Sequence, residues 1–273
     1  MRKEMIILQI AVLIKSVVAT DEPVHVREGM IEDSGAKRVI NPYDEYGLEE
    51  ALRWKESLGG TVIAIGAGGE RTVDALRTAL AMGADEAIWI RVDDEAADEH
   101  SYAMLIAETL RKKQYDIVFA GHLSIDNGAG QVAIRVAELL GWPHAGAIVA
   151  CEAVDGGRLL VTRDAEGDSE DWELTLPAIV TAQQGLNEPR YPALAGIIKA
   201  KRKPLTELTP QDLGVSLERV SSSELDGAPR TERVCIEVPA ARQPGRKLSG
   251  ATGEQAAELL RLLREEAQVL EGR

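Results

Sequence analysis

Cysteine is scarce in this sequence. Only Cys151 and Cys235 occur, far apart and without C-x-x-C spacing, so neither a disulfide scaffold nor a zinc site of the usual spacing is indicated. We therefore expect a reducing, cytoplasmic setting. The four histidines show no metal-ligand spacing either, so no metal site is expected, and His25, His100 and His144 are interpreted as structural.

Positive charge is also in short supply. The chain has 31 Lys and Arg residues against 45 Asp and Glu, which gives a net charge of -14. This balance disfavours nucleic acid and membrane surfaces as partners, because both are anionic. The apolar run at residues 5–14 imitates a signal peptide, but Gln9 interrupts it, Lys15 ends it too early to span a bilayer, and no A-x-A site follows. A buried parallel strand is the better interpretation.

Catalytic motifs are missing as well. The sequence contains no G-x-S-x-G motif and no Ser/His/Asp order that stands out. It also lacks a Walker A loop and the G-x-G-x-x-G fingerprint. We assign no catalytic residue, and we do not expect the chain to be an enzyme by itself.

Apolar segments of strand length alternate with helical patterns through the first half of the chain. This order predicts an α/β fold, a Rossmann-like open parallel sheet with helices on both faces. Strands are expected at residues 6–14, 61–67, 86–92 and 116–120. Helices are expected from Pro42, with Asn41 as the cap, and at residues 70–82, 99–113 and 133–140. The turn at Gly66–Gly69 is expected to be a glycine-rich loop.

The pattern changes after Trp142-Pro143. Shorter strands separated by turn signals predict a small antiparallel extension, with strands at residues 145–152, 158–164, 172–176 and 178–181. Residues 183–210 show almost no periodicity, and a segment of this length without secondary structure usually has a function. An amphipathic helix is expected at residues 253–270.

The stretch GHLSIDNGAGQV, residues 121–132, lies between a predicted buried strand and a predicted helix. Gly128 and Gly130 would let the backbone approach a ligand closely, and the amides at the helix start form an anion site. The alternative is a loop that merely turns the chain. His122 could donate to a phosphate or could be a solvated loop histidine.

Ligands of open parallel sheets bind beyond the carboxyl ends of the strands. Residues 13–17, 41–44 and 66–69 are expected at the same edge as this loop, and together they could enclose an adenine, a ribose and a phosphate. A separate basic cluster is either a solvated loop or a docking face for acidic proteins, and consists of Lys199, Lys201, Arg202 and Lys203.

Four segments resemble the β subunit of electron transfer flavoproteins, in that family's order and spacing over residues 5–215. They are NPYDEYGLEEALR at 41–53, LRTALAMGAD at 76–85, IDNGAGQ at 125–131, and LNEPRY at 186–191 running into IKAKRKP at 198–204. The LNEPRY segment with its lysine run is highly specific to the family.

The resemblance implies a structural AMP in this chain and a redox-active FAD in a partner α subunit. Carried over by position, it implies AMP contacts at Leu13, Asn41, Pro42, Tyr43, Asp44, Ala67, Gly121, His122, Leu123, Ser124, Ile125, Asp126, Asn127, Gly128, Ala129, Gly130, Gln131 and Val132. Many members have a more acidic run where this chain has residues 127–130, so amides rather than side chains would hold the phosphate.

The resemblance also implies a recognition loop. Leu194 and Lys199 would dock acyl-CoA dehydrogenases and similar flavin dehydrogenases, and Asp164 would approach the α-subunit flavin. Electrons would then pass to a quinone oxidoreductase. The expected organisation is a nucleotide-binding domain at residues 1–182 with the antiparallel extension, a recognition loop at 183–210 and a C-terminal arm at 211–273 with a terminal helix.

Three other functions are compatible with part of this pattern. The first is a bifurcating electron transfer flavoprotein with a second FAD in the same pocket. The second is an ATP-cleaving hydrolase on a similar fold, which should need a Ser-Gly-Gly-x-Asp-Ser type loop that Lys15-Ser-Val-Val does not supply. The third is a stand-alone adenine-nucleotide-binding protein, which would leave the long aperiodic segment and its lysines unexplained.

Overall fold

The chain forms two compact units, residues 1–235 and 236–273, which are described separately. The computed structural model describes residues 8–27, 30–32, 35–93, 97–154, 156–218, 226–242 and 244–269.

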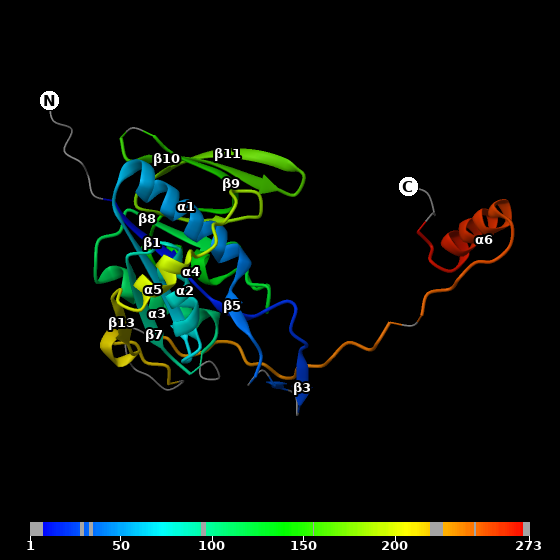
Figure 1. Cartoon of the computed structure of the whole chain (residues 1–273), viewed down its shortest axis with the longest axis horizontal. Helices are drawn as coiled ribbons and strands as arrows, with labels where there is room; N and C mark the ends of the chain where they lie inside the picture. The colour runs from blue at the N-terminus through cyan, green and yellow to red at the C-terminus, as the bar shows by residue number, and fades with distance from the viewer. Residues whose placement is uncertain are drawn as a thin grey trace. The chain divides into compact units, whose positions relative to one another are not determined.

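A nine-stranded sheet forms the centre of the first unit (Figure 1). Its strand order is β11-β10-β9-β12-β8-β1-β6-β7-β13. All pairings from β9 to β13 are parallel, whereas β10 and β11 pair antiparallel at one end. The strands are β1 (Gln9–Leu13), β6 (Thr61–Gly68), β7 (Glu86–Arg91), β8 (Ile117–Gly121), β9 (His144–Val154), β10 (Arg158–Ala165), β11 (Asp168–Thr175), β12 (Ala178–Ala182) and β13 (Leu205–Leu208). The predicted Rossmann-like α/β class is confirmed.

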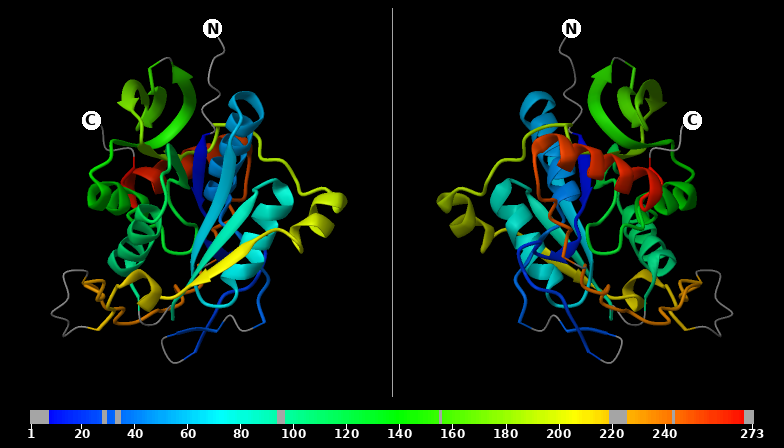
Figure 2. Two further views of the ribbon diagram at one scale, coloured as in Figure 1. Left: turned by 90° about the vertical axis from the view of Figure 1, so that its left-hand side faces the viewer. Right: turned by 90° about the vertical axis from the view of Figure 1, so that its right-hand side faces the viewer.

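Helices cover both faces of the sheet (Figure 2). The alternation of side chains in β1 explains why: Ile10 and Val12 face one core, and Ala11 and Leu13 face the other. The first core is completed by α1 (Pro42–Leu58) and α2 (Thr72–Met82), and the second by α3 (Glu99–Arg111) and α4 (Val132–Leu140).

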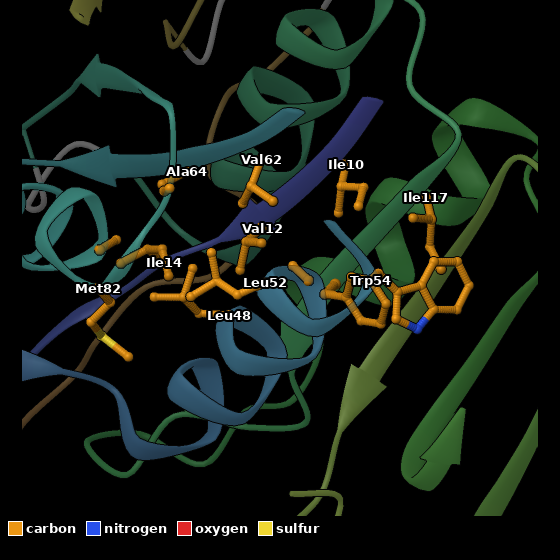
Figure 3. Packing of buried hydrophobic residues seen from close by; sticks show 14 of the residues in the cluster. Ile10, Val12, Ile14, Leu48, Leu52, Trp54, Val62, Ala64, Met82 and Ile117 are labelled. Atoms are coloured by element: carbon orange, nitrogen blue, oxygen red, sulfur yellow. The ribbon is translucent and has the colours of Figure 1, made fainter. Parts of the chain in front are cut away.

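The core under α1 is closely packed and apolar (Figure 3). Leu48 and Leu52 lie against the strands, as their helical spacing predicts, and both are buried. The Trp54 ring meets the ring of Phe119 on β8 edge to face, with centroids 5.6 Å apart. These contacts fix α1 across the centre of the sheet.

Three predictions about these elements need correction. β12 does not belong to the antiparallel extension, because it pairs parallel with both β8 and β9. The segment predicted to be aperiodic contains α5 (Leu194–Ala200) and the edge strand β13, which pairs with β7. Gly66 to Gly68 continue β6 rather than forming a loop. Short elements of this kind are stabilised by tertiary pairing, which periodicity does not report.

A small ribbon returns the chain to the end of β1. β2 (Ser16–Val18) pairs antiparallel with β5 (Arg38–Ile40), and Ser16 lies opposite Ile40. A second pair is formed by β3 (His25–Arg27) and β4 (Met30–Glu32). The ribbon places Asn41, at the start of α1, beside Lys15, and the Asn41 N–H donates to the Lys15 carbonyl at 2.9 Å.

The second unit contains α6 (Thr252–Glu265). None of its residues is buried, and Leu259 and Leu260 are exposed. The helix is shorter than predicted, and Leu270 of that prediction lies outside the described residues. In the described part of the chain, no helix is long and apolar enough to cross a membrane.

Candidate functional site

The strand order reverses at the centre of the sheet. From β1 the chain adds β6 and β7 on one side, then crosses to β8 on the other side. The carboxyl ends of β1 and β8 therefore diverge into loops on opposite faces, and such a switch point is the usual ligand position of open α/β sheets. Residues 14–15 and the glycine-rich loop at 122–131 line this point.

Asp44, in the first turn of α1, joins the two strand ends. Its carboxylate accepts the backbone N–H of Lys15 at 2.7 Å and that of Gly121 at 3.0 Å. The side chain is buried, and desolvation raises its pKa to about 7 although these hydrogen bonds oppose the shift. A side chain on Gly121 would overlap Asp44, since its Cβ would meet the Asp44 carboxylate and lie 2.8 Å from the Asp44 nitrogen.

Asn41 precedes α1, but its side chain does not cap the helix as predicted. Its Nδ2 instead donates to Asp44 Oδ1 at 3.0 Å and to the Leu123 carbonyl at 2.9 Å. Its Oδ1 accepts the N–H of Ile125 at 3.2 Å. The buried amide therefore connects α1 to the glycine-rich loop, a role for which capping propensity gave no signal.

The glycine-rich loop turns through two left-handed residues before α4 begins. Gly128 and Gly130 have φ values of 64° and 59°, a region that favours glycine, whereas the close approach of a ligand for which they were predicted stays a prediction. Ser124 Oγ donates to Asn127 Oδ1 at 2.9 Å, and the Ala129 N–H donates to the same oxygen at 3.1 Å. The loop thus has its own internal bonds and ends at the amino end of α4, whose first amides lack partners within the helix.

Lys15 also reaches this loop; the sequence placed residues 13–17 at the ligand edge of the sheet but predicted no contact for the Lys15 side chain. Its ammonium group donates to Ser124 Oγ at 3.0 Å and to Asp126 Oδ1 at 2.7 Å. Of that range, Leu13 was predicted as a contact residue and Lys15 was not. The available signal was its position two residues beyond Leu13, at the expected ligand edge of the sheet.

His122 is half-buried rather than a solvated loop residue. Its Nδ1 lies 3.3 Å from Thr181 Oγ1 on β12. Burial and the nearby charge of Arg163 lower the pKa of the ring, whereas Asp164 opposes them. The strand register also places the end of β10 at this level of the sheet, since Arg163 lies opposite Ile148 on β9 and Ile148 lies opposite Ala182 on β12. Ala182 in turn lies opposite Gly121.

The other predicted contact residues occupy the same edge. Leu13 ends β1, and Ala67 lies near the end of β6, opposite Ile90. Pro42 and Tyr43 open α1 next to Asp44. The structure thus brings together the three strand ends, the start of α1 and residues 121–132, while ligand binding by them stays a prediction.

The LNEPRY segment is attached to the outer side of α1. Asn187 Nδ2 donates to the Tyr46 carbonyl and to Glu50 Oε2, each at 3.0 Å. Arg190 donates to both oxygens of Glu49, through Nε at 2.8 Å and Nη2 at 3.0 Å. An ion pair and a side-chain hydrogen bond therefore join the LNEPRY segment to α1, from which it is far apart in the sequence.

Beyond this anchor the chain presents apolar side chains to solvent. Tyr191 is 94% exposed and Leu194 is 75% exposed, and Ile197 and Ile198 are exposed beside them in the sequence. Underneath, α5 approaches α2 so closely that a Cβ on Gly196 would overlap the Ala81 carbonyl. We call residues 191–199 the apolar segment.

The basic cluster divides into two parts. Lys199, Lys201 and Arg202 are exposed. Lys203 turns inward, and its Nζ donates to the carbonyls of Leu80 at 2.9 Å and Ala84 at 2.6 Å, at the end of α2. The idea that all four form one docking face is therefore wrong for Lys203, which closes a helix terminus.

The doubly wound sheet, with the glycine-rich loop at its switch point, defines a protein of the Rossmann-like α/β class. The family model described as "Electron transfer flavoprotein domain" matches residues 28–213. The chain is 43% identical to the electron transfer flavoprotein subunit beta of Bacillus subtilis (strain 168) over 96% of this chain and 100% of that protein. It is 36% identical to the human protein of the same name over 84% of this chain and 93% of that protein. The chain belongs to the electron transfer flavoprotein β-subunit family.

Proposed function

We propose that this chain is the β-type half of a heterodimeric electron carrier, with an adenine nucleotide at the switch point. A partner α subunit would carry the redox-active FAD. Electrons would enter from acyl-CoA dehydrogenases and similar flavin dehydrogenases and leave toward a quinone oxidoreductase. No residue of this chain makes or breaks bonds in this scheme, and the working compartment would be the cytoplasm.

The position of the glycine-rich loop carries the nucleotide part of the proposal. The loop follows β8 at the switch point, contains two left-handed glycines and leads into the amino end of α4. Backbone amides with the helix dipole behind them suit a phosphate. AMP would fit here as a ligand that stabilises the fold, since the strand ends and α1 already meet at Asn41 and Asp44.

The apolar segment supports the docking part. Four large apolar side chains are exposed next to Lys199, Lys201 and Arg202, on a base that Asn187 and Arg190 hold against α1. An apolar anchor within a charged rim suits a short-lived complex with an acidic partner. Asp164 would lie toward the α-subunit flavin, because the loop and the β10 end face the same region.

The ligand content tests the first part. The chain would be purified with its α partner, the complex denatured, and released FAD and AMP counted per heterodimer. One FAD with one AMP is expected. Two FADs without AMP would replace this proposal with the bifurcating one, and the absence of any nucleotide from this chain would reject the site.

A substitution tests the docking part. Leu194→Ala should slow reduction of the heterodimer's FAD by an acyl-CoA dehydrogenase at limiting concentrations. Leu58→Ala, at the end of α1, is the matched control because Leu58 is also an exposed leucine. Equal rates for the two variants would contradict docking through Leu194.

A further inference from the structure

The Lys15 side chain reaches from the end of β1 to the loop after β8. It bonds Ser124 Oγ at 3.0 Å and Asp126 Oδ1 at 2.7 Å. Its own backbone is held by Asp44 and Asn41, so the base of the side chain is fixed while the ammonium end remains partly exposed. A cation therefore stands at the point where ligands of this fold class bind.

We propose that Lys15 binds the phosphate of the nucleotide, and that Asp126 is the ion-pair partner of the Lys15 ammonium group until the phosphate displaces it. The inference rests on the proposed nucleotide site and adds to it a residue and an exchange of ionic partners. The ligand chemistry is an adenine nucleotide phosphate, whether the monophosphate of AMP or the pyrophosphate of FAD.

The charge balance at the switch point supports a cationic partner. Asp126 lies in the loop, where its carboxylate would repel a phosphate, and the buried Asp44 would add to this repulsion when it is ionised. Backbone amides supply only partial charges, whereas a lysine supplies a full one. Among the described residues of 121–132, His122 is the one other basic side chain, and burial and Arg163 lower its pKa.

The present partner is one that a phosphate can replace. The Lys15 and Asp126 side chains are 41% and 33% exposed, and pairs with such access to water contribute little to stability. Two hydrogen bonds within the loop do not involve Lys15 and would remain after the exchange. Ser124 Oγ donates to Asn127 Oδ1, and the Asn127 N–H donates to Asp126 Oδ1. The loop thus retains internal bonds when Lys15 changes partner.

Two substitutions with opposite expected effects test the exchange. The full chain in complex with its α subunit would be stripped of the nucleotide held by this chain, with the FAD of the α subunit retained, and titrated with AMP, adenosine and FAD. Lys15→Met should weaken AMP binding by roughly 10- to 100-fold, the loss expected for one charged hydrogen bond, and leave adenosine binding unchanged. Asp126→Asn should bind AMP at least as tightly as the wild type, because a competitor for Lys15 is removed.

Lys15→Arg is the matched control, since it keeps the charge and should retain AMP affinity within a few-fold if the exchange is correct. Equal weakening of AMP and adenosine by both Lys15→Met and Asp126→Asn would overturn the proposal, because Lys15 would then only support the loop. Loss of affinity for FAD instead of AMP would keep Lys15 as a phosphate ligand and identify FAD as the occupant. A wild-type complex that binds none of the three would reject the nucleotide site itself, and with it this role for Lys15.

Discussion

Removal of Arg190 should destabilise the first unit far more than removal of another ion-paired arginine. Arg190 donates to both oxygens of Glu49, whose side chain is only 5% exposed, and also to Glu56. Arg190→Ala would leave the buried Glu49 carboxylate with the hydrogen bond from Arg53 Nε. Breaking a fully buried pair costs about 3–5 kcal/mol, and partial solvent access at Arg190 reduces this to about 2–3 kcal/mol.

The measurement is urea unfolding of Arg190→Ala and of Arg158→Ala at pH 7. Arg158 pairs with Glu173, and their side chains are 46% and 55% exposed, so its loss should cost about 0–1 kcal/mol. The Arg190 variant should also lower Tm by roughly 4–12 °C for a unit of this size. Equal losses for the two variants would refute the claim that burial of Glu49 makes the difference.

The same contacts give the Arg190 pair a pH dependence. Burial alone would raise the pKa of Glu49, but the hydrogen bonds from Arg190 outweigh it and hold that pKa below its usual value. The stabilisation is therefore present above the unfolded pKa, near 4.3, and is lost as pH falls through the lower folded pKa. The gap between wild type and Arg190→Ala should shrink in acid.

Three further outcomes follow from the contacts of the switch point and of α3. Gly121→Ala should lower the urea midpoint more than Gly128→Ala, because a Cβ at residue 121 overlaps Asp44. A Cβ at residue 128 would meet no atom within 4 Å, so that substitution should lose only the free energy of placing alanine in a left-handed backbone, about 1–2 kcal/mol. Burial raises the pKa of Asp44 to about 7, above its unfolded value near 3.9. The unfolding free energy of the wild type should therefore fall as pH rises from about 4 to 7 and level off above, and Asp44→Asn should lack this pH dependence. Asp98→Ala should cost about 1–2 kcal/mol of unfolding free energy at pH 7, since Asp98 caps α3 and accepts the N–H of Arg230. Burial alone would raise the pKa of Asp98, but these hydrogen bonds lower it, so this cost should fall away below pH 4. A difference that does not depend on pH would contradict the assignment.

Much of the central fold could be predicted because its signals are local. The apolar runs that became β6, β7 and β8 are continuous enough to require burial on both faces, and Leu48 and Leu52 have the four-residue spacing of one helix face, which is the inner face of α1.

The features that sequence reasoning missed depend on partners distant in the chain. Asn41 looked like a helix cap, yet its amide bonds Leu123 and Ile125, more than 80 residues away. Lys203 looked like surface charge, yet it closes α2. The parallel pairing of β12 and the position of the Lys15 ammonium group follow from sheet topology, which local pattern does not encode.

Helix α1 joins the two halves of the proposed function mechanically. Its first turn contacts the glycine-rich loop through Asn41 and Asp44, and its later turns hold the LNEPRY segment through Glu49 and Glu50. At about 1.5 Å per residue the 17-residue helix is a strut of roughly 25 Å, packed along its length against the sheet. A displacement at either end should therefore reach the other end as a rigid tilt or slide of α1, so the proposed nucleotide site and the apolar segment should shift together. The rate of hydrogen exchange at residues 186–191 should then change when a nucleotide binds.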